Sequence, residues 1–184
     1  IRRIGWKRTG KENVMNKQNE YEAVSHDFDP VFDENSQVLI LGTFPSVKSR
    51  EHHFYYGHPQ NRFWKVIARL TDSEVPQSIA EKKQLLLQHG IAIWDVIESC
   101  EIIGSSDSSI RNVVAADLSW LLSQCEIRKI YANGGTAKKL YERYSQKTTG
   151  REIIGLPSTS PANAAYSLDR LMEYWSVIKE ECRW

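Results

Sequence analysis

The chain has 184 residues, of which 41% are hydrophobic and 26% are charged, with a formal net charge of +1. This length suits one domain with one buried core, and no apolar run approaches the roughly 20 residues of a membrane-spanning helix. The near-neutral balance excludes nucleic-acid binding driven by overall charge, so any such contact depends on local surfaces.

The cysteines limit the metal and redox chemistry that is open to the chain. Cys100, Cys125 and Cys182 are odd in number and far apart. This argues against a disulfide framework and a zinc ribbon, and a typical iron–sulfur cluster needs four cysteines. No apolar signal-peptide core with a small-residue cleavage site is found among the first residues, so we expect a cytoplasmic protein with reduced thiols and no bound cofactor.

Residues 1–20 form a basic segment with little apolar periodicity. We predict a flexible basic N-terminal tail, which is either a phosphate-binding arm or simply a disordered end. Residues 21–184 are then predicted to form a single domain.

Beyond residue 37, short apolar runs alternate with segments of helical spacing. Strands are predicted at 38–41, 91–94, 129–132 and 152–156, and helices at 59–70, 78–88, 113–125, 136–144 and 167–180. This alternation predicts a three-layer α/β/α sandwich around a four-stranded parallel sheet. Since ligands of such sheets bind beyond the carboxyl ends of the strands, the residues that follow each strand are candidates for a site.

The first candidate segment begins at Gly42 and continues to a stretch that holds Tyr55, Tyr56, His58 and Asn61. Glycine lets a ligand approach the backbone, and tyrosine rings can stack on a nucleobase. The side chains of His58 and Asn61 precede a predicted helix, where they serve either as caps or as active-site groups.

The second candidate segment follows the last predicted strand and contains Pro157, Ser158, Thr159, Ser160 and Asn163. Small hydroxyl residues held between prolines can grip phosphates through short donors and backbone N–H groups. The alternative is an ordinary Ser/Pro turn.

Taken together, the two segments resemble the uracil-DNA glycosylase superfamily. The stretch from His58 to Lys65, His-Pro-Gln-Asn-Arg-Phe-Trp-Lys, is similar to the mismatch-specific uracil/thymine-DNA glycosylases. With Tyr55-Tyr56-Gly57, the run 90–95 and the loop 156–163, the chain is most similar to the hypoxanthine-DNA glycosylase branch. The resemblance covers about residues 36–180.

The resemblance implies a base pocket made by Gly42, Thr43, Phe44, Tyr56 and Asp95. Phe44 stands where most of the superfamily has an Asp or Asn that activates water, and a phenyl ring cannot do this. Tyr56 matches the aromatic residue that stacks on the flipped base. Asp95 falls where the uracil-specific enzymes have a base-reading Asn; the alternative for Asp95 is a helix N-cap.

Three further positions follow from the same resemblance. Asn61 is the expected catalytic residue, because the hypoxanthine branch relies on the matching Asn. The loop 157–163 is expected to bind the DNA backbone, with Lys48, Arg50 and Arg62 as nearby basic contacts. Leu156 replaces the His that stabilises the departing uracil anion, which favours a purine substrate.

We therefore predict a DNA glycosylase of base excision repair that removes hypoxanthine from DNA. We expect the enzyme to act as a monomer and to need no metal. His52 and His53 adjoin each other, but adjacent histidines usually point apart and no metal motif accompanies them. The alternatives are a mismatch-specific uracil/thymine-DNA glycosylase and a non-catalytic DNA-binding protein of this fold.

Overall fold

The computed structural model describes residues 20–182. The predicted basic tail, residues 1–20, lies outside the described residues except for its last residue. The elements are, in chain order, β1 (Glu22–Ser25), β2 (Val38–Gly42), α1 (Val47–His52), α2 (Phe63–Leu70), α3 (Ile79–Gln88), β3 (Ile91–Asp95), β4 (Ile97–Ile102), η2 (Asp107–Ser109), β5 (Arg111–Ala115), α4 (Leu118–Gln124), β6 (Lys129–Asn133), α5 (Gly135–Tyr144), α6 (Gln146–Thr149), β7 (Ile154–Leu156), α7 (Leu168–Trp175) and η3 (Ser176–Glu180).

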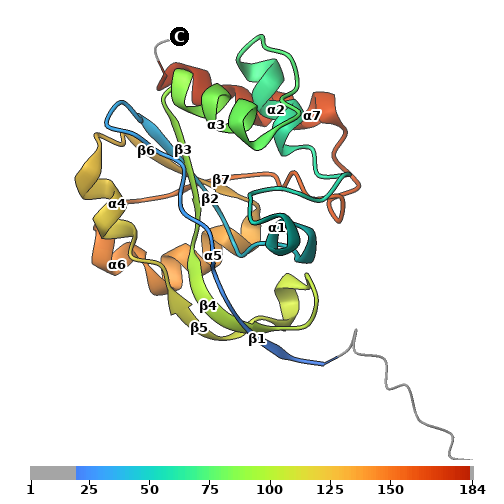
Figure 1. Cartoon of the computed structure of the whole chain (residues 1–184). Helices are drawn as coiled ribbons and strands as arrows, with labels where there is room; N and C mark the ends of the chain where they lie inside the picture. The colour runs from blue at the N-terminus through green and yellow to red at the C-terminus, as the bar shows by residue number, and fades with distance from the viewer. Residues whose placement is uncertain (1–19, 183–184) are drawn as a thin grey trace, which may run out of the picture.

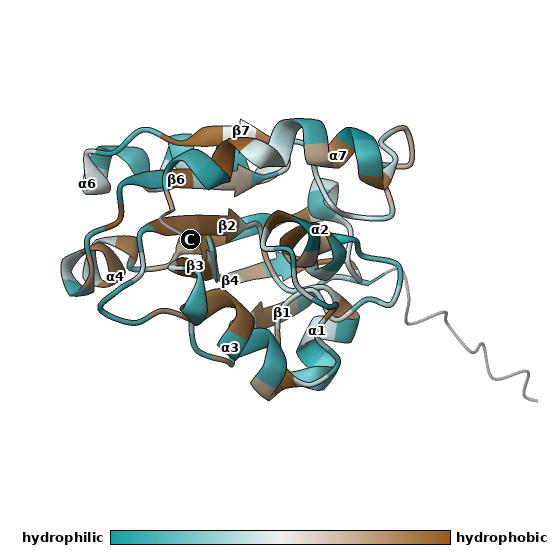
Figure 2. Cartoon of the chain, turned by 90° about the horizontal axis from the view of Figure 1, so that it is seen from above, coloured by the Kyte–Doolittle hydropathy of each residue, from teal (hydrophilic) through white to brown (hydrophobic). Residues whose placement is uncertain are grey.

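The predicted parallel sheet is confirmed, with strand order β3-β2-β6-β7. Every residue of β2 and β3 is buried, as expected for strands covered on both faces. Helices α2, α3 and α7 lie on one side of this sheet and α5 and α6 on the other (Figure 1). Seen from above, β2 is hydrophobic along its length in the middle of the molecule (Figure 2), so the three-layer sandwich is confirmed.

A second sheet, which the sequence patterns did not predict, lies beside the first. It is antiparallel, with order β1-β4-β5, and it lies at the bottom of Figure 1. Only Val96 separates β3 from β4, so one extended stretch passes from the parallel sheet into the antiparallel one. The predicted helix 113–125 was wrong in its first part, because Val113 belongs to β5 and the helix begins only at Leu118.

Helix ends follow their capping groups. The hydroxyls of Ser78 and Ser167 accept hydrogen bonds from the backbone N–H groups of Glu81 and Arg170, which caps the first turns of α3 and α7. The helix predicted to begin at residue 59 begins at Phe63 instead, and the short helices α1 and α6 were not predicted.

The core ties the last helix to the loop after β7. Trp175 is fully buried, its ring meets Phe63 edge to face, and its indole N–H donates to the carbonyl of Pro157 at 2.9 Å. Among residues 20–182, none of the helices is both long enough and apolar enough to span a bilayer.

Trp175→Phe tests this link between core and loop. The variant keeps an aromatic ring but leaves the half-buried Pro157 carbonyl without its donor, so we expect it to lose about 1–3 kcal/mol of unfolding free energy in a urea titration. The neighbouring Tyr174 is 47% exposed, and Tyr174→Phe serves as the control, with an expected change below about 0.5 kcal/mol. Equal stability of the two variants would contradict the assignment.

Candidate functional site

One cavity of about 490 Å³ lies where the four parallel strands end, within the usual range of small-ligand pockets, roughly 300–1,000 Å³. Nine of the residues selected from the sequence line it: Gly42, Thr43, Phe44, Tyr56, Asn61, Asp95, Ser158, Thr159 and Ser160. The structure thus brings the two candidate segments together across the end of the sheet. Pro157 and Asn163 lie outside the lining.

Gly42 is required because two side chains crowd its Cα. A Cβ atom there would lie 2.4 Å from Oδ1 of Asp95 and 3.2 Å from the hydroxyl of Tyr56. Real Cβ atoms do not approach another atom to 2.4 Å, so any other residue would displace Asp95 or the strand. Gly42 therefore lets the floor of the cavity close around the carboxylate.

Tyr56 presents one face of its ring for stacking. The other face is stacked on Phe63, with ring centroids 3.9 Å apart and planes inclined by 18°. Burial first, and then the charge of Asp95, raise the pKa of the Tyr56 phenol well above its usual value, although a hydrogen bond from Asn133 opposes them. Tyr56 is therefore a neutral phenol at physiological pH and not a proton acceptor.

Asn61 is held by a chain of hydrogen bonds that crosses the cavity wall. Its Oδ1 accepts from the backbone N–H of Phe63 at 2.9 Å and from the hydroxyl of Thr159 at 2.8 Å. Thr159 in turn accepts from Nδ2 of Asn133, whose Oδ1 accepts the Thr159 backbone N–H, both at 3.0 Å. Because backbone N–H groups can only donate, these bonds fix both amide orientations, and the amide NH₂ of Asn61 is left to face the cavity.

Arg62 clamps the loop after β7. Its Nη2 donates to the carbonyls of Ser160 at 2.9 Å and Asn163 at 3.0 Å, its Nη1 to that of Tyr166, and its Nε to that of Thr159 at 3.3 Å. Four of its five guanidinium N–H groups thus donate to protein carbonyls, which favours a role as a loop clamp over the predicted contact with DNA phosphate.

Two other residues of that loop also have internal roles. The Asn163 side chain donates to the Ser158 carbonyl at 3.0 Å, and the Pro157 carbonyl accepts from Trp175. The serines are different, because Ser158 and Ser160 line the cavity and are only partly buried. The backbone N–H groups of Thr159, Ser160 and Ala162 are bonded within the protein. Any grip on a phosphate from this loop therefore comes chiefly from the hydroxyls of its serines.

Asp95 is buried, 4% exposed, and forms an ion pair with His26, whose Nε2 lies 2.8 Å from Oδ2. The alternative that Asp95 is a helix N-cap was wrong, since β4 and not a helix follows it. Burial alone would lower the pKa of His26, but the hydrogen bond and charge of Asp95, with Glu98 and the Phe28 backbone, raise it overall. His26 thus holds one carboxylate oxygen and leaves Oδ1 beside Gly42.

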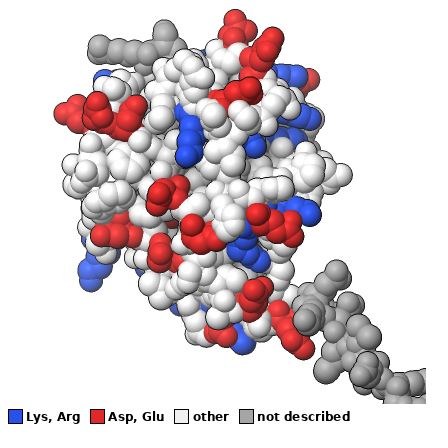
Figure 3. Space-filling view, in the orientation of Figure 1, with Lys and Arg blue, Asp and Glu red and all other residues white. Residues whose placement is uncertain are grey.

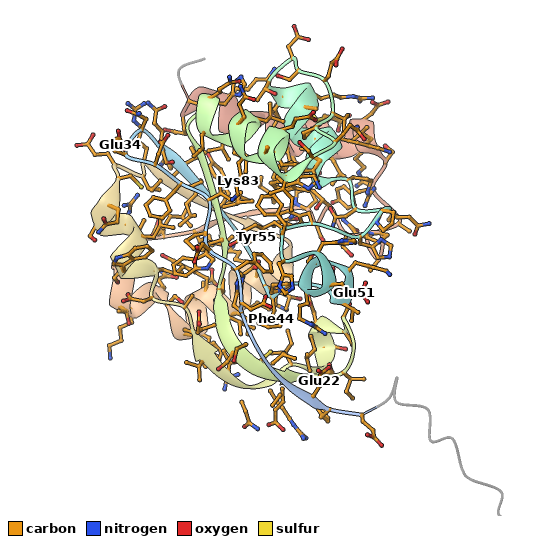
Figure 4. The ribbon with its side chains drawn as sticks, in the orientation of Figure 1. Glu22, Glu34, Phe44, Glu51, Tyr55 and Lys83 are labelled. Carbon is orange, nitrogen blue, oxygen red and sulfur yellow. The ribbon has the colours of Figure 1, made fainter. Side chains whose placement is uncertain are left out.

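Phe44 turns its ring toward the second sheet. It is 8% exposed and packs with Ile97, Cys100 and Ile102 of β4, and Figure 4 shows it in the interior beside α1. The guanidinium of Arg50 lies 5.7 Å from the ring centroid. The position that resembles the water-activating one is therefore part of the core.

A carboxylate that the sequence patterns missed enters the cavity from the turn between β4 and β5. Asp107 lines the cavity with three serines of the same turn, Ser105, Ser106 and Ser108. Asp107 keeps part of its surface exposed to solvent, and desolvation by the residues around its carboxyl group, followed by the charge of Asp95, raises its pKa to about 6, while the nearby Thr43 side chain opposes the rise. Asp107 is therefore a carboxylate at pH 7 that is unusually basic.

The histidines do not form a metal centre. His58 lines the cavity, and its Nδ1 accepts the backbone N–H of Gln60 at 3.1 Å. His53 instead pairs with Asp27 at 2.8 Å on the surface. Over residues 20–182, no three His, Cys, Asp or Glu side chains gather as a metal site.

Of the residues that sequence reasoning missed, Asn133 had the clearest signal, because it follows a predicted strand as Gly42 and Asp95 do. The polar run Gly104-Ser105-Ser106-Asp107 was a weaker signal for a site loop. His26 had none, since it precedes the first predicted element.

Comparisons with known proteins agree with this geometry. The model of the uracil DNA glycosylase superfamily matches residues 30–180. A protein of Methanosarcina acetivorans named hypoxanthine DNA glycosylase is 35% identical over 85% of this chain and 99% of its own length. A Methanosarcina barkeri protein of the same name is 33% identical over 74% of this chain and 86% of its own.

A structural comparison gives the same picture. A solution NMR structure from Methanosarcina acetivorans, described as that of a candidate uracil DNA glycosylase, superposes with a TM-score of 0.72 at 34% identity. It matches 83% of this chain and 95% of its own.

Arg62→Gln separates a loop clamp from a phosphate contact. Because Arg62 bonds only to carbonyls, we expect the variant to lose stability and DNA affinity while the slope of log K against log salt stays unchanged. A slope reduced by about one would instead show that Arg62 neutralises a phosphate. The control is Arg69→Gln in α2, which alters an exposed pair with Asp169 of α7 and should change stability by less than about 1 kcal/mol.

Proposed function

Because the chain belongs to the uracil DNA glycosylase superfamily, we propose that it is a monofunctional DNA glycosylase that hydrolyses the N-glycosidic bond of hypoxanthine in DNA. The observation that best supports this function is one cavity, in which the loops after the four parallel strands meet the segment that holds Asn61. The names of the Methanosarcina relatives support hypoxanthine as the base.

The cavity chemistry suits a deaminated purine. Oδ1 of Asp95 lies at the floor, where it can accept the N1–H of hypoxanthine, whereas adenine has a bare N1 that would face the carboxylate unfavourably. The free face of Tyr56 offers stacking, as in other sites that read extruded bases. Leu156 is buried in the core. The position that the resemblance assigns to a uracil-stabilising His therefore has no side-chain donor.

The nucleophile of the proposed reaction is a water molecule and not a side-chain amine. None of the described residues that line the cavity is a lysine or a cysteine, so the lining supports direct hydrolysis over a covalent intermediate. The amide NH₂ of Asn61 can hold the water oxygen or the departing base by donation, which stabilises charge that develops in the transition state.

DNA binding is expected to rest on local groups. Acidic and basic side chains alternate over the face seen in Figure 3, so no broad basic surface is available on that face. The hydroxyls of Ser158 and Ser160, in the loop after β7, are our candidates for the phosphate contacts. One chain supplies the whole cavity, which supports action as a monomer.

Excision assays on duplexes with hypoxanthine, uracil or thymine opposite each normal base test this function. We expect abasic product chiefly from hypoxanthine, and we expect Asn61→Ala to abolish it while the fold remains. The variant loses the donor and two hydrogen bonds, from Phe63 N–H and the Thr159 hydroxyl, each worth about 1 kcal/mol. Gln60→Ala, an exposed neighbour, is the matched control.

Two outcomes would replace the proposal. A clear preference for uracil would make the chain a mismatch-specific enzyme, and binding without abasic product from any duplex would make it a non-catalytic DNA-binding protein. Near-normal turnover in Asn61→Ala would remove Asn61 from the mechanism.

A further inference from the structure

The cavity needs a group that takes a proton from the attacking water, and the residues assigned so far do not provide one. Asn61 has its Oδ1 engaged by two donors and turns an NH₂ group to the cavity. Tyr56 is a neutral phenol, and Phe44 carries no polar atom. Asp95 is engaged by His26 and lies at the cavity floor beside Gly42, in position to read the base.

Asp107 supplies a carboxylate next to the position where the family has its water-activating residue. Its side chain lines the same cavity as Thr43, Phe44 and Asn61, so it faces the loop that carries position 44. The phenyl ring at position 44 is thus accompanied by an acid that reaches the same loop from a different part of the chain.

The turn that carries Asp107 is held in place from both sides. The Ser109 hydroxyl accepts the N–H of Ile103 at 2.8 Å and donates to the Ser106 carbonyl at 2.6 Å. From α1, the N–H of Val47 donates to the Ser105 hydroxyl at 2.9 Å. A carboxylate on such a braced turn is positioned before substrate arrives, as efficient proton transfer requires.

We propose that Asp107 is a catalytic residue, the general base that accepts a proton from the attacking water; this role rests on the proposed glycosylase function. The C1′–N9 bond breaks and leaves its electron pair on the base, while the water oxygen bonds to C1′. One water proton passes to the Asp107 carboxylate, and a proton from solvent neutralises the departing base, so that the products are an abasic sugar and free hypoxanthine.

The charges around Asp107 suit this role. Asp95, itself paired with His26, raises the pKa of Asp107. Arg50 and the buried thiol of Cys100 also lie near this region, and His58 and the phenol of Tyr56 line the same cavity. A pKa of about 6 leaves Asp107 ionised at pH 7 but much more basic than an ordinary aspartate. A base whose pKa lies near the working pH is the effective one.

The raised pKa of Asp107 also means that its ionised form lowers the stability of the folded protein. Its pKa in the folded protein, about 6, lies above the usual 3.8, so folding favours the protonated form and stability falls as pH rises from about 4 to 6. Above that range the full penalty remains. A residue kept for packing would stabilise the protein, whereas one kept for chemistry can destabilise it.

Asp107→Asn tests the proposal by single-turnover excision of hypoxanthine from pH 5 to 9. The wild-type rate should rise with pH around a midpoint near 6, the pKa of Asp107. The variant should be slower by about 10²–10⁴-fold and should lack that midpoint. Its melting temperature at pH 8 should equal or exceed that of the wild type, because the unfavourable charge is gone.

Asp72→Asn is the matched control: it makes the same change at an exposed left-handed residue outside the cavity and should leave rate and midpoint unchanged. An Asp107→Asn rate within threefold of the wild type, or a persisting midpoint near 6, would overturn the role of Asp107. A lower melting temperature together with a lower rate would assign the residue to structure instead. If the wild type itself released no base from any duplex, the proposed function would fail and this role with it.

Discussion

The Thr159 side chain is the contact on which the site depends. Thr159 is fully buried, and its hydroxyl stands between Asn133 at the end of β6 and Asn61 at the start of α2, so that three segments distant in sequence share one hydrogen-bond chain. The Arg62 guanidinium fixes the same loop from its carbonyl side. These contacts are buried polar bonds that are expensive to leave unmade, which keeps the loops in one arrangement.

Hydrophobic patterning was enough to predict the parallel sheet, because continuous apolar runs such as 38–41 admit few other structures. The second sheet escaped prediction for a physical reason: β5 is mostly exposed and begins with Arg111 and Asn112, and Val113 falls in helical spacing with the residues of α4. The rule of strand ends located Gly42 and Asp95. It could not find His26, which pairs with Asp95 from just after β1, or Asp107, which lines the cavity from the turn between β4 and β5. Antiparallel pairing places both residues, and no local pattern encodes that pairing.

The second sheet also explains why position 44 can be aromatic. The passage from β3 into β4 creates an apolar pocket of Ile97, Cys100 and Ile102, which the Phe44 ring fills. The turn that closes the same sheet returns Asp107 to the loop beside Phe44. The second sheet thus explains both why position 44 carries no acid and why Asp107 faces the same part of the cavity.

Single-turnover excision of hypoxanthine by Thr159→Val tests most directly the claim that this cavity is the active site. Valine keeps the shape of threonine but removes the hydroxyl that orients Asn61, so the rate should fall at least about tenfold while Thr159→Ser, which keeps the hydroxyl, stays near wild type. Equal rates in Thr159→Val and the wild type would contradict the account, because Asn61 would then act without the hydrogen-bond chain that places it in the cavity.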